Sequence, residues 1–225
     1  MKVFIINLKN RSDKWQQMQK QLDQRFIKYE RFDAVNGKEL TNVNLSIRAE
    51  SVLKLKKKKS QLDIDCWGHV GSYLSHYALW QRCLEEAEPI VILEDDVILN
   101  SNFTLDLPNV DFLSLGQEKI QINKRQEFKP WTNGGHMYVG AWAYMLTPKT
   151  AAEFIKYAFP IDMAIDFYMQ AILAKSNIPF QILTMVKPNP SFKSDLDHYP
   201  LESDNTFFYI IFIILVGNFI YTMLK

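Results

Sequence analysis

Hydrophobic positions along the chain follow two different periods. Short continuous runs of β-branched and aromatic residues, such as residues 3–8 and 90–93, are typical of buried strands. Residues 10–26 instead carry apolar side chains at helical spacing after a suitable N-cap at Ser12. Strands and helices of this kind alternate along most of the chain. The pattern therefore predicts an α/β fold with a mostly parallel central sheet flanked by helices.

The remaining elements are predicted from the same two periods. Helices are expected over residues 66–88, 148–158 and 160–176, a strand and turn over residues 29–40, and strands over residues 90–99, 110–116, 136–147 and 180–188. Pro148 suits the first turn of its helix. Within residues 66–88, Tyr73, Trp80 and Leu84 share the face that we expect to be buried.

Three adjacent acids interrupt the most hydrophobic stretch of this region. Glu94, Asp95 and Asp96 follow the apolar residues 90–93, and the apolar pattern resumes at Val97. A buried acid is costly unless it is paired or bound to a cation, so this placement needs a reason. At the carboxyl end of a strand, Glu94 and Asp96 would share one face and Asp95 would take the other. Carboxylates at that spacing suit Mg²⁺ or Mn²⁺.

The residues alone leave other interpretations of these acids open. They could cap a following helix or pair with lysines at the strand end. A phosphatase that forms an aspartyl phosphate would also place acids after a hydrophobic strand. Asp95-Asp96-Val97 fits that pattern only loosely, and it comes late in the chain.

Composition narrows the classes of protein to consider. With 225 residues, 48% of them hydrophobic, the chain can bury a core without disulfides. Its two cysteines, Cys66 and Cys83, fit reduced thiols in a cytosol-like compartment better than a secreted disulfide framework. The 26 basic residues nearly balance the 25 acidic ones, and the net charge of +1 gives no field that would recruit nucleic acid.

The carboxyl-terminal part has a different composition. Residues 207–225 carry no charge before the final lysine, and about 18 uncharged residues are the lower limit for spanning a bilayer. A soluble core helix usually keeps a polar face, which this segment lacks. We therefore expect a domain over residues 1–203 and a membrane-associated tail over residues 204–225, with a buried terminal element as the alternative. The lysine-rich residues 54–59 are either a solvated face or a contact with anionic lipid.

Four stretches in series carry a resemblance to a known family. They are "VFIINLKNRSDK" (3–14), "FDAVNGKEL" (32–40), "GHVGSYLSH" (68–76) and "IVILEDDVIL" (90–99). With them, roughly residues 1 to 200 of the chain resemble glycosyltransferase family 25, the bacterial lipooligosaccharide galactosyltransferases and their relatives. The chain departs from the family pattern at Lys14, where an arginine is usual, at Asn36, where an aspartate is usual, and at Ser72, where a cysteine is usual.

The resemblance implies a GT-A-like nucleotide-sugar-binding fold and a metal-assisted, inverting transfer. The sugar, expected to be galactose, would pass from a UDP-sugar to a lipid-linked lipooligosaccharide or lipopolysaccharide acceptor. Because bacterial UDP-sugars are cytosolic, the enzyme would work at the inner face of the inner membrane. The acidic run then plays the part of the family's DxD-like motif. Glu94 and Asp96 would lie near Mn²⁺ (or Mg²⁺), and Asp95 nearer the donor ribose or sugar.

Two further acids are candidates for the catalytic base that takes the acceptor's hydroxyl proton. Asp162 and Asp166 lie four residues apart on a predicted helix and would share one of its faces. Asp162 matches a Pro-x-Asp of the family and is the first choice. The alternative is that it caps the helix.

The resemblance also indicates residues that contact the donor. Asn7 and Arg11 follow the first strand, where an arginine could hold a phosphate or an acid, although a plain surface arginine is the alternative. His76 either touches the donor nucleotide or orders its own helix. His198 is a candidate late metal ligand, because related folds often supply one from a carboxyl-terminal loop.

Rival functions remain on the sequence alone. UDP-glucose or a UDP-N-acetylhexosamine could be the donor, since pocket shape decides between them. A catalytically silent, membrane-associated protein that binds sugar nucleotides is the alternative outside the enzymes. The intact acidic run and Asp162 argue against such a loss of turnover.

Overall fold

The computed structural model describes residues 1–40, 65–116, 120–121, 136–137, 140–159, 161, 164–192 and 195. The chain divides into two compact units, residues 1–195 and 196–225, and all described residues belong to the first. The expected tail over residues 204–225 and the lysine-rich residues 54–59 therefore lie outside the described part. Within that part, no helix combines the length and apolar character that a membrane crossing needs.

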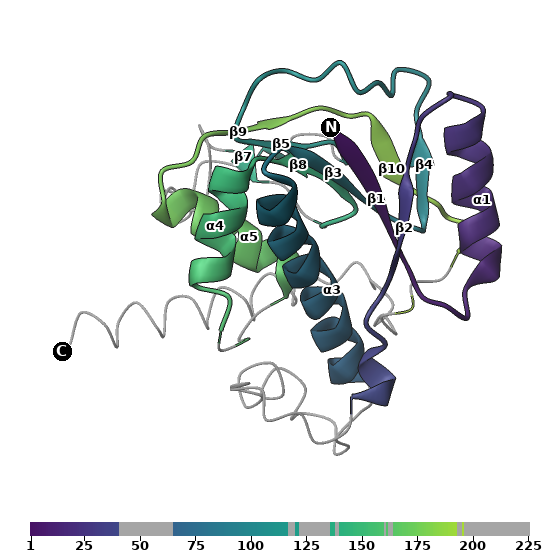
Figure 1. Cartoon of the computed structure of the whole chain (residues 1–225), viewed down its shortest axis with the longest axis horizontal. Coiled ribbons are helices and arrows are strands. Elements are labelled where there is room, and N and C mark those ends of the chain that lie inside the picture. Colours follow the sequence, from purple (N-terminus) through teal and green to yellow (C-terminus); the bar gives the residue numbers. More distant parts are fainter. Residues whose placement is uncertain are drawn as a thin grey trace. The chain divides into compact units, whose positions relative to one another are not determined.

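A six-stranded sheet forms the centre of this unit (Figure 1), with the strand order β2-β1-β3-β8-β5-β9. Its strands are β1 (Lys2–Asn7), β2 (Glu30–Asp33), β3 (Ile90–Glu94), β5 (Phe112–Ser114), β8 (Ala143–Leu146) and β9 (Phe180–Ile182). Strand β8 runs antiparallel to both of its neighbours, while the other paired strands are parallel. The predicted α/β class with a mostly parallel sheet is confirmed.

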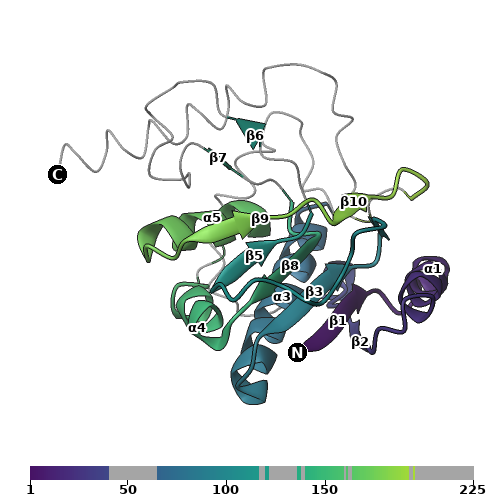
Figure 2. The same cartoon turned by 90° about the horizontal axis from the view of Figure 1, so that it is seen from above.

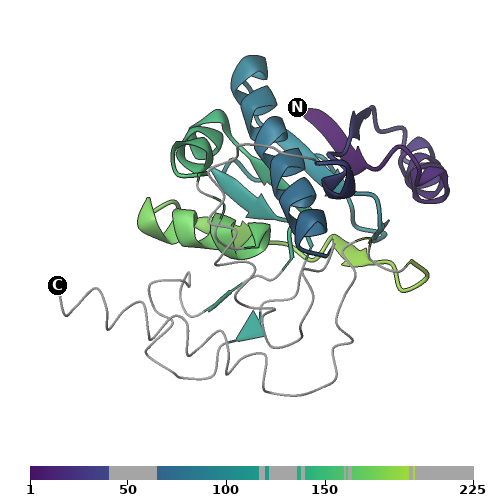
Figure 3. The same cartoon turned by 90° about the horizontal axis from the view of Figure 1, so that it is seen from below.

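Helices cover both faces of the sheet. They are α1 (Ser12–Asp23), α3 (Asp65–Glu86), α4 (Pro148–Lys156) and α5 (Ile165–Lys175), with a short 3-10 helix η1 (Gly37–Glu39). Two small strand pairs complete the described part, β4 (Val97–Leu99) with β10 (Val186–Pro188) and β6 (Ile120–Gln121) with β7 (His136–Met137). Helices α3, α4 and α5 pack on one face, and α1 packs with β4 and β10 on the other (Figures 2 and 3).

Two hydrophobic cores explain why the strands are apolar throughout. Successive side chains of a strand point to opposite faces of its sheet. In β1, Phe4 and Ile6 enter the core under α3, α4 and α5, whereas Val3 and Ile5 enter the core under α1. Strand β3 divides in the same way. A strand buried on both faces has no polar alternation, so it appears in the sequence as a continuous hydrophobic run.

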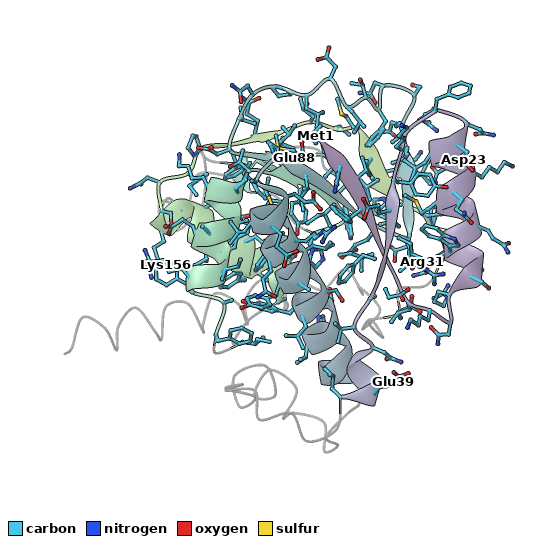
Figure 4. All side chains as sticks on the ribbon, in the orientation of Figure 1. Met1, Asp23, Arg31, Glu39, Glu88 and Lys156 are labelled. Atoms are coloured by element: carbon cyan, nitrogen blue, oxygen red, sulfur yellow. The ribbon has the colours of Figure 1, made fainter. Side chains whose placement is uncertain are left out.

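The two central parallel strands are also joined at their amino ends. The terminal ammonium of Met1 lies 3.4 Å from Glu88 Oε2, and both residues are labelled in Figure 4. The pair is partly exposed, so its contribution to stability is small. The register of the two strands is defined by their backbone pairing, in which Lys2 lies opposite Ile90.

Three predicted strands are each divided in the structure, and one of them, over residues 136–147, contains β7 and β8 in place of a single strand. The sequence predicted one strand over residues 90–99, but β3 ends at Glu94 and β4 begins at Val97, because Asp95 and Asp96 form a turn. Residues 180–188 likewise form β9 and β10 rather than one strand. Strand β10 then pairs with β4 on the α1 side, away from the main sheet.

The buried face of α3 differs slightly from the predicted one. Tyr73 and Trp80 are buried as expected, but Leu84 is 41% exposed and the neighbouring Cys83 is buried instead. With 3.6 residues per turn, the inner stripe reaches Cys83 one step before Leu84. Cys83 is a free thiol, and burial raises its pKa to about 12. The side chain of Cys66 lies outside the described part.

Candidate active site

The carboxyl ends of β1 and β3 lie side by side and bring polar residues together. The strands are parallel, and Ile6 pairs with Glu94 at their ends. The next residue on each strand is polar, and Asn7 Nδ2 donates a hydrogen bond of 2.6 Å to Asp95 Oδ2. Ligands of open α/β sheets bind at such ends. The predicted position of the acidic run at a strand end is therefore confirmed.

Asn7 is buried and held from two sides. Its Nδ2 also donates to the carbonyl oxygen of Arg11, 3.0 Å away, and the side chain is 1% exposed. Its Oδ1 has no hydrogen-bond partner among the residues that the structure describes. Buried amide oxygens are rarely left unpaired, so we expect an ordered water or a ligand to satisfy this atom.

Lys14 lies at the centre of the polar cluster. Its Nζ is 3.1 Å from Asp96 Oδ2, 3.5 Å from Asp95 Oδ1 and 2.6 Å from Asp195 Oδ2. The residue is 1% exposed. Burial alone would lower the pKa of Lys14, but the attraction of the three carboxylates outweighs it and raises that pKa. The site therefore contains a protonated ammonium ion surrounded by carboxylates.

The acids of the run do not share faces as the sequence predicted. Alternation holds only in an extended segment, and Asp95 and Asp96 form a turn. Both aspartates consequently face Lys14, while Glu94 contacts His76. Burial raises the pKa of Asp95 to about 6, although Lys14 and Asn7 favour its ionised form. Pairing with a lysine at a strand end, one of the alternatives considered above, is present in the structure.

His76 links Glu94 to the core beneath it. Its Nε2 lies 3.3 Å from Glu94 Oε1, and its Nδ1 lies 2.8 Å from the hydroxyl of Tyr144. Trp80 Nε1 donates to the same hydroxyl, 3.0 Å away. Because an indole N–H can only donate, the contacts are satisfied when Tyr144 donates to Nδ1 and Nε2–H donates to Glu94. Burial raises the pKa of Tyr144 well above its usual value, which keeps that hydroxyl protonated.

This arrangement bears on the predicted role of His76. The ring is 1% exposed, and both of its nitrogens are already in contact with other side chains. The structure thus favours the alternative in which His76 orders its surroundings over direct contact with the donor. What His76 fixes is the position of Glu94.

A carboxyl-terminal segment reaches the cluster from far along the chain. The backbone N–H of Asn189 donates to the Asp96 carbonyl, 2.8 Å away, and the ring centroid of Phe192 lies 5.9 Å from both Arg11 Cζ and Lys14 Nζ. Asp195 accepts hydrogen bonds from Arg11 and from Lys14. Arg11 is therefore part of the site rather than a plain surface residue.

Asp195 is the residue that the sequence analysis missed. It belongs to "SDLDHYP", the acidic stretch just before His198, so an acid close to the candidate histidine was the available signal. His198 itself lies outside the described residues.

The structure describes only one of the two candidate bases, Asp166. Helix α5 begins at Ile165 after an extended Ala164, so the helix does not start as early as predicted. Asp166 lies in the first turn of this helix. Its Oδ1 accepts a hydrogen bond of 2.9 Å from the backbone N–H of Phe167, and its Oδ2 accepts one of 3.0 Å from the backbone N–H of Gly140. Asp166 thus holds backbone groups in place. Asp162 lies outside the described residues, so its proposed role stays a prediction.

Two of the stretches behind the family resemblance pack against each other beside the site. A Cβ added to Gly71 of α3 would lie 2.5 Å from the carbonyl oxygen of Val35 and 2.6 Å from the backbone nitrogen of Gly37. Four residues further along α3, Ser75 Oγ accepts the backbone N–H of Val35 at 2.9 Å. The close approach of the two backbones explains the need for glycine at position 71.

The oxygen atoms of the site are of the kind that bind divalent cations, although the ammonium group of Lys14 lies among them. Asp95, Asp96 and Asp195 offer hard oxygens, which Mg²⁺ and Mn²⁺ prefer, and Asn7 Oδ1 adds an unpaired one. As the described side chains stand, no three of the acids, histidines or cysteines are grouped closely enough to hold a metal ion. The oxygens are thus of the kind such an ion prefers, but the ammonium of Lys14 occupies the space among them.

Comparisons with known proteins agree on one family. The sequence profile of "Glycosyltransferase family 25 (LPS biosynthesis protein)" matches residues 1–169. Procollagen galactosyltransferase 2 of Homo sapiens is 30% identical over 130 residues, which are 55% of this chain and 21% of that protein. Procollagen galactosyltransferase 1-B of Xenopus laevis is 29% identical over 140 residues, covering 57% and 23%. A glycosyltransferase 25 family member of Drosophila melanogaster is 24% identical over 177 residues, covering 73% and 29%.

These matches cover less than a third of each relative's own length. A solved structure is also similar, that of a glycosyltransferase involved in the glycosylation of the major capsid of PBCV-1. It has a TM-score of 0.44 at 8% identity and covers 86% of this chain and 95% of its own.

Proposed function

The chain belongs to glycosyltransferase family 25, and we propose that it transfers a sugar, galactose, from a UDP-sugar to an oligosaccharide acceptor with inversion. The observation that carries the proposal is the polar cluster at the carboxyl ends of β1 and β3. There Asn7, Lys14, Asp95 and Asp96 converge, and a buried amide oxygen is left for a ligand. Galactose is supported by the names of two of the relatives above, which are procollagen galactosyltransferases.

The two cations of the site support a diphosphate-containing donor. A UDP leaving group is strongly anionic, and Arg11 and Lys14 provide two cations beside the strand ends. Asp95, Asp96 and Asp195 are the residues that would hold Mn²⁺ or Mg²⁺. When bound, such an ion neutralises charge that develops on the leaving group.

The chain's own residues fix the geometry around that charge. Asn7 anchors Asp95 by a direct hydrogen bond. Glu94 is held by His76, away from Lys14. This separation argues against the metal role expected from the sequence, and we propose that Glu94 contacts the donor sugar in its place.

The proposed acceptor is a lipid-linked oligosaccharide of lipopolysaccharide biosynthesis, reached from the bacterial cytoplasm at the inner membrane. It rests on the description of the family and on the apolar residues 207–225. Transfer from UDP-glucose or a UDP-N-acetylhexosamine is the alternative within the enzymes. A catalytically silent protein that binds sugar nucleotides is the alternative outside them.

One assay tests the function directly. The purified chain is incubated with Mn²⁺, an acceptor glycan and a panel of nucleotide sugars, and UDP release and product mass are measured. Release of UDP with a mass gain of one hexose from UDP-galactose supports the proposal. Binding of UDP without turnover on any donor or acceptor would favour the silent binding protein.

The base assignment gives a prediction of its own. Asp162→Asn is expected to lower turnover by about 10²-fold or more, because the amide cannot take the acceptor's proton. Binding of UDP and the unfolding temperature should stay as in the wild type. Turnover, UDP affinity and thermal unfolding are measured on the same preparation.

Asp166→Ala is the matched comparison. Its carboxylate accepts two backbone N–H groups, so the variant should lose about 1 kcal/mol of stability and keep its turnover per folded molecule. A stable Asp166→Ala variant without turnover, together with an active Asp162→Asn, would reverse the assignment.

The proposed membrane contact predicts the behaviour of a shortened chain. A chain that ends at Ser203 should stay soluble and active on a short water-soluble acceptor, but it should no longer sediment with membranes. A surface-bound acceptor is then used less efficiently, because the anchor no longer raises its local concentration. An unfolded fragment would instead show that the apolar residues 207–225 belong to the core.

A further inference from the structure

Lys14 occupies a position where a lysine is unfavourable on two counts. It lies on the inner stripe of α1 together with Met18 and Leu22, so its ammonium is removed from water. It is also the third residue of that helix, and the positive end of the helix dipole disfavours a cation there. Neither local structure nor hydrophobic packing explains its presence.

The acids around Lys14 supply the explanation. Asp95, Asp96 and Asp195 come from two distant parts of the chain, and each places a carboxylate oxygen within 3.5 Å of the same nitrogen atom. Asp195 is shared with Arg11, which also pairs with Asp13, so four carboxylates face two cations. The cluster keeps an excess of negative charge, and Lys14 Nζ lies at the point where its carboxylates converge.

We propose that Lys14 is the internal cation of this site, which takes the place of the divalent cation in the ligand-free protein and must leave before that cation binds. This inference rests on the metal-assisted transfer proposed above. An ammonium and a divalent cation cannot share the same carboxylates without strong repulsion. The long, flexible side chain of a lysine allows it to move away, toward a diphosphate or toward solvent.

The same reasoning explains the spacing of the carboxylates. Oxygens that surround an ammonium lie at hydrogen-bond distance from its nitrogen, whereas Mg²⁺ requires oxygens at about 2.1 Å. The described acids have the wider spacing. Departure of Lys14 would let Asp95, Asp96 and Asp195 close on a smaller ion.

The test is the affinity of the full chain for Mn²⁺ alone, without nucleotide or acceptor, measured at one fixed pH by the electron paramagnetic resonance of free Mn²⁺. Lys14→Met keeps a long, unbranched apolar side chain and removes the charge. We expect it to bind Mn²⁺ about tenfold or more tightly than the wild type. Lys14→Arg keeps the charge and should bind as weakly as the wild type.

Two controls separate this effect from a general change in charge. Lys20→Met removes a charge from an exposed position of the same helix and should leave Mn²⁺ affinity unchanged. Adding Asp96→Asn to Lys14→Met should cancel the gain, because a ligand is lost. A folded Lys14→Met variant that binds Mn²⁺ no more tightly than Lys20→Met overturns the proposal.

The wild type provides a second measurement in case Lys14→Met does not fold. Lys14 is buried, so an amine-acetylating reagent should modify it slowly in metal-free protein and at least about tenfold faster once Mn²⁺ is bound. Lys20, which is exposed, should react equally in both states. Mass spectrometry of the peptides measures both rates. Mn²⁺ bound at the site while Lys14 stays protected contradicts the inference.

Failure of this inference and failure of the proposed function give different results. A wild type that transfers sugar while Lys14→Met gains no affinity would reject the role of Lys14 alone. A chain that transfers no sugar, although Lys14→Met gains affinity for Mn²⁺, would keep the cation site and reject the proposed reaction.

Discussion

Asp96→Asn is expected to abolish sugar transfer while the protein stays folded. Asp96 Oδ2 lies 3.1 Å from Lys14 Nζ, in the place where the proposed metal would bind. An amide of the same size cannot supply the charge that holds a cation against a diphosphate. The wild type in excess EDTA should lose activity in the same way and regain it with Mn²⁺. Initial rates of UDP release measure both effects.

Stability should hardly fall in this variant. Asp95 and Asp195 remain to compensate Lys14, and removal of Asp96 relieves repulsion among the three carboxylates. Asp106→Asn, the same change at an exposed position, is the control for the substitution itself. Full activity of Asp96→Asn, or of the wild type in EDTA, would remove the metal role from this group of acids.

Gly71→Ala is expected to destabilise the protein by about 2 kcal/mol or more. In a helix interior, alanine is normally more favourable than glycine by about 1 kcal/mol, so the expected sign is reversed here. The reason is that the new Cβ would meet the backbone of Val35 and Gly37, which cannot move aside like the end of a side chain. Thermal unfolding should show a decrease of roughly 5 °C.

Ser72→Ala, at the next position of α3, is the matched control and should leave the unfolding temperature nearly unchanged. Ser75→Ala should fall between the two, because it leaves the partly buried N–H of Val35 without its acceptor. A Gly71→Ala variant as stable as the wild type would mean that the two backbones separate readily. The packing between α3 and the turn at Gly37 would then not position the site.

The sheet and the position of the acidic run could be predicted because they depend on local patterns. Continuous apolar runs identify strands buried on both faces, and the alternation with helices indicates parallel neighbours. Asn7 could accordingly be placed after the first strand and Asp95 at the carboxyl end of another, although their direct contact could not. The turn at Asp95 and Asp96 could not be predicted, because the apolar residues on both sides of it are typical of one continuous strand.

The partners within the site could not be predicted, since they depend on contacts between distant residues. In the sequence Lys14 is only a departure from the family's usual arginine, and no local pattern shows that it is buried. Asp195 is separated from Arg11 by 184 positions. The helix around Asp166 begins at Ile165, later than predicted, because Ala164 adopts an extended conformation. Nothing in the sequence at Ala164 indicates that conformation.

The contact between Asp195 and Lys14 also sets an order of events during synthesis. Asn7, Lys14, Asp95 and Asp96 emerge from the ribosome within the first half of the chain, but Asp195 follows about 100 residues later. At typical rates of synthesis of about 5–20 residues per second, Asp195 becomes available to the ammonium of Lys14 only several seconds after Asp95 and Asp96. A nascent chain can therefore form the sheet edge early, yet it becomes a complete binding site only when the segment around Asp195 has docked.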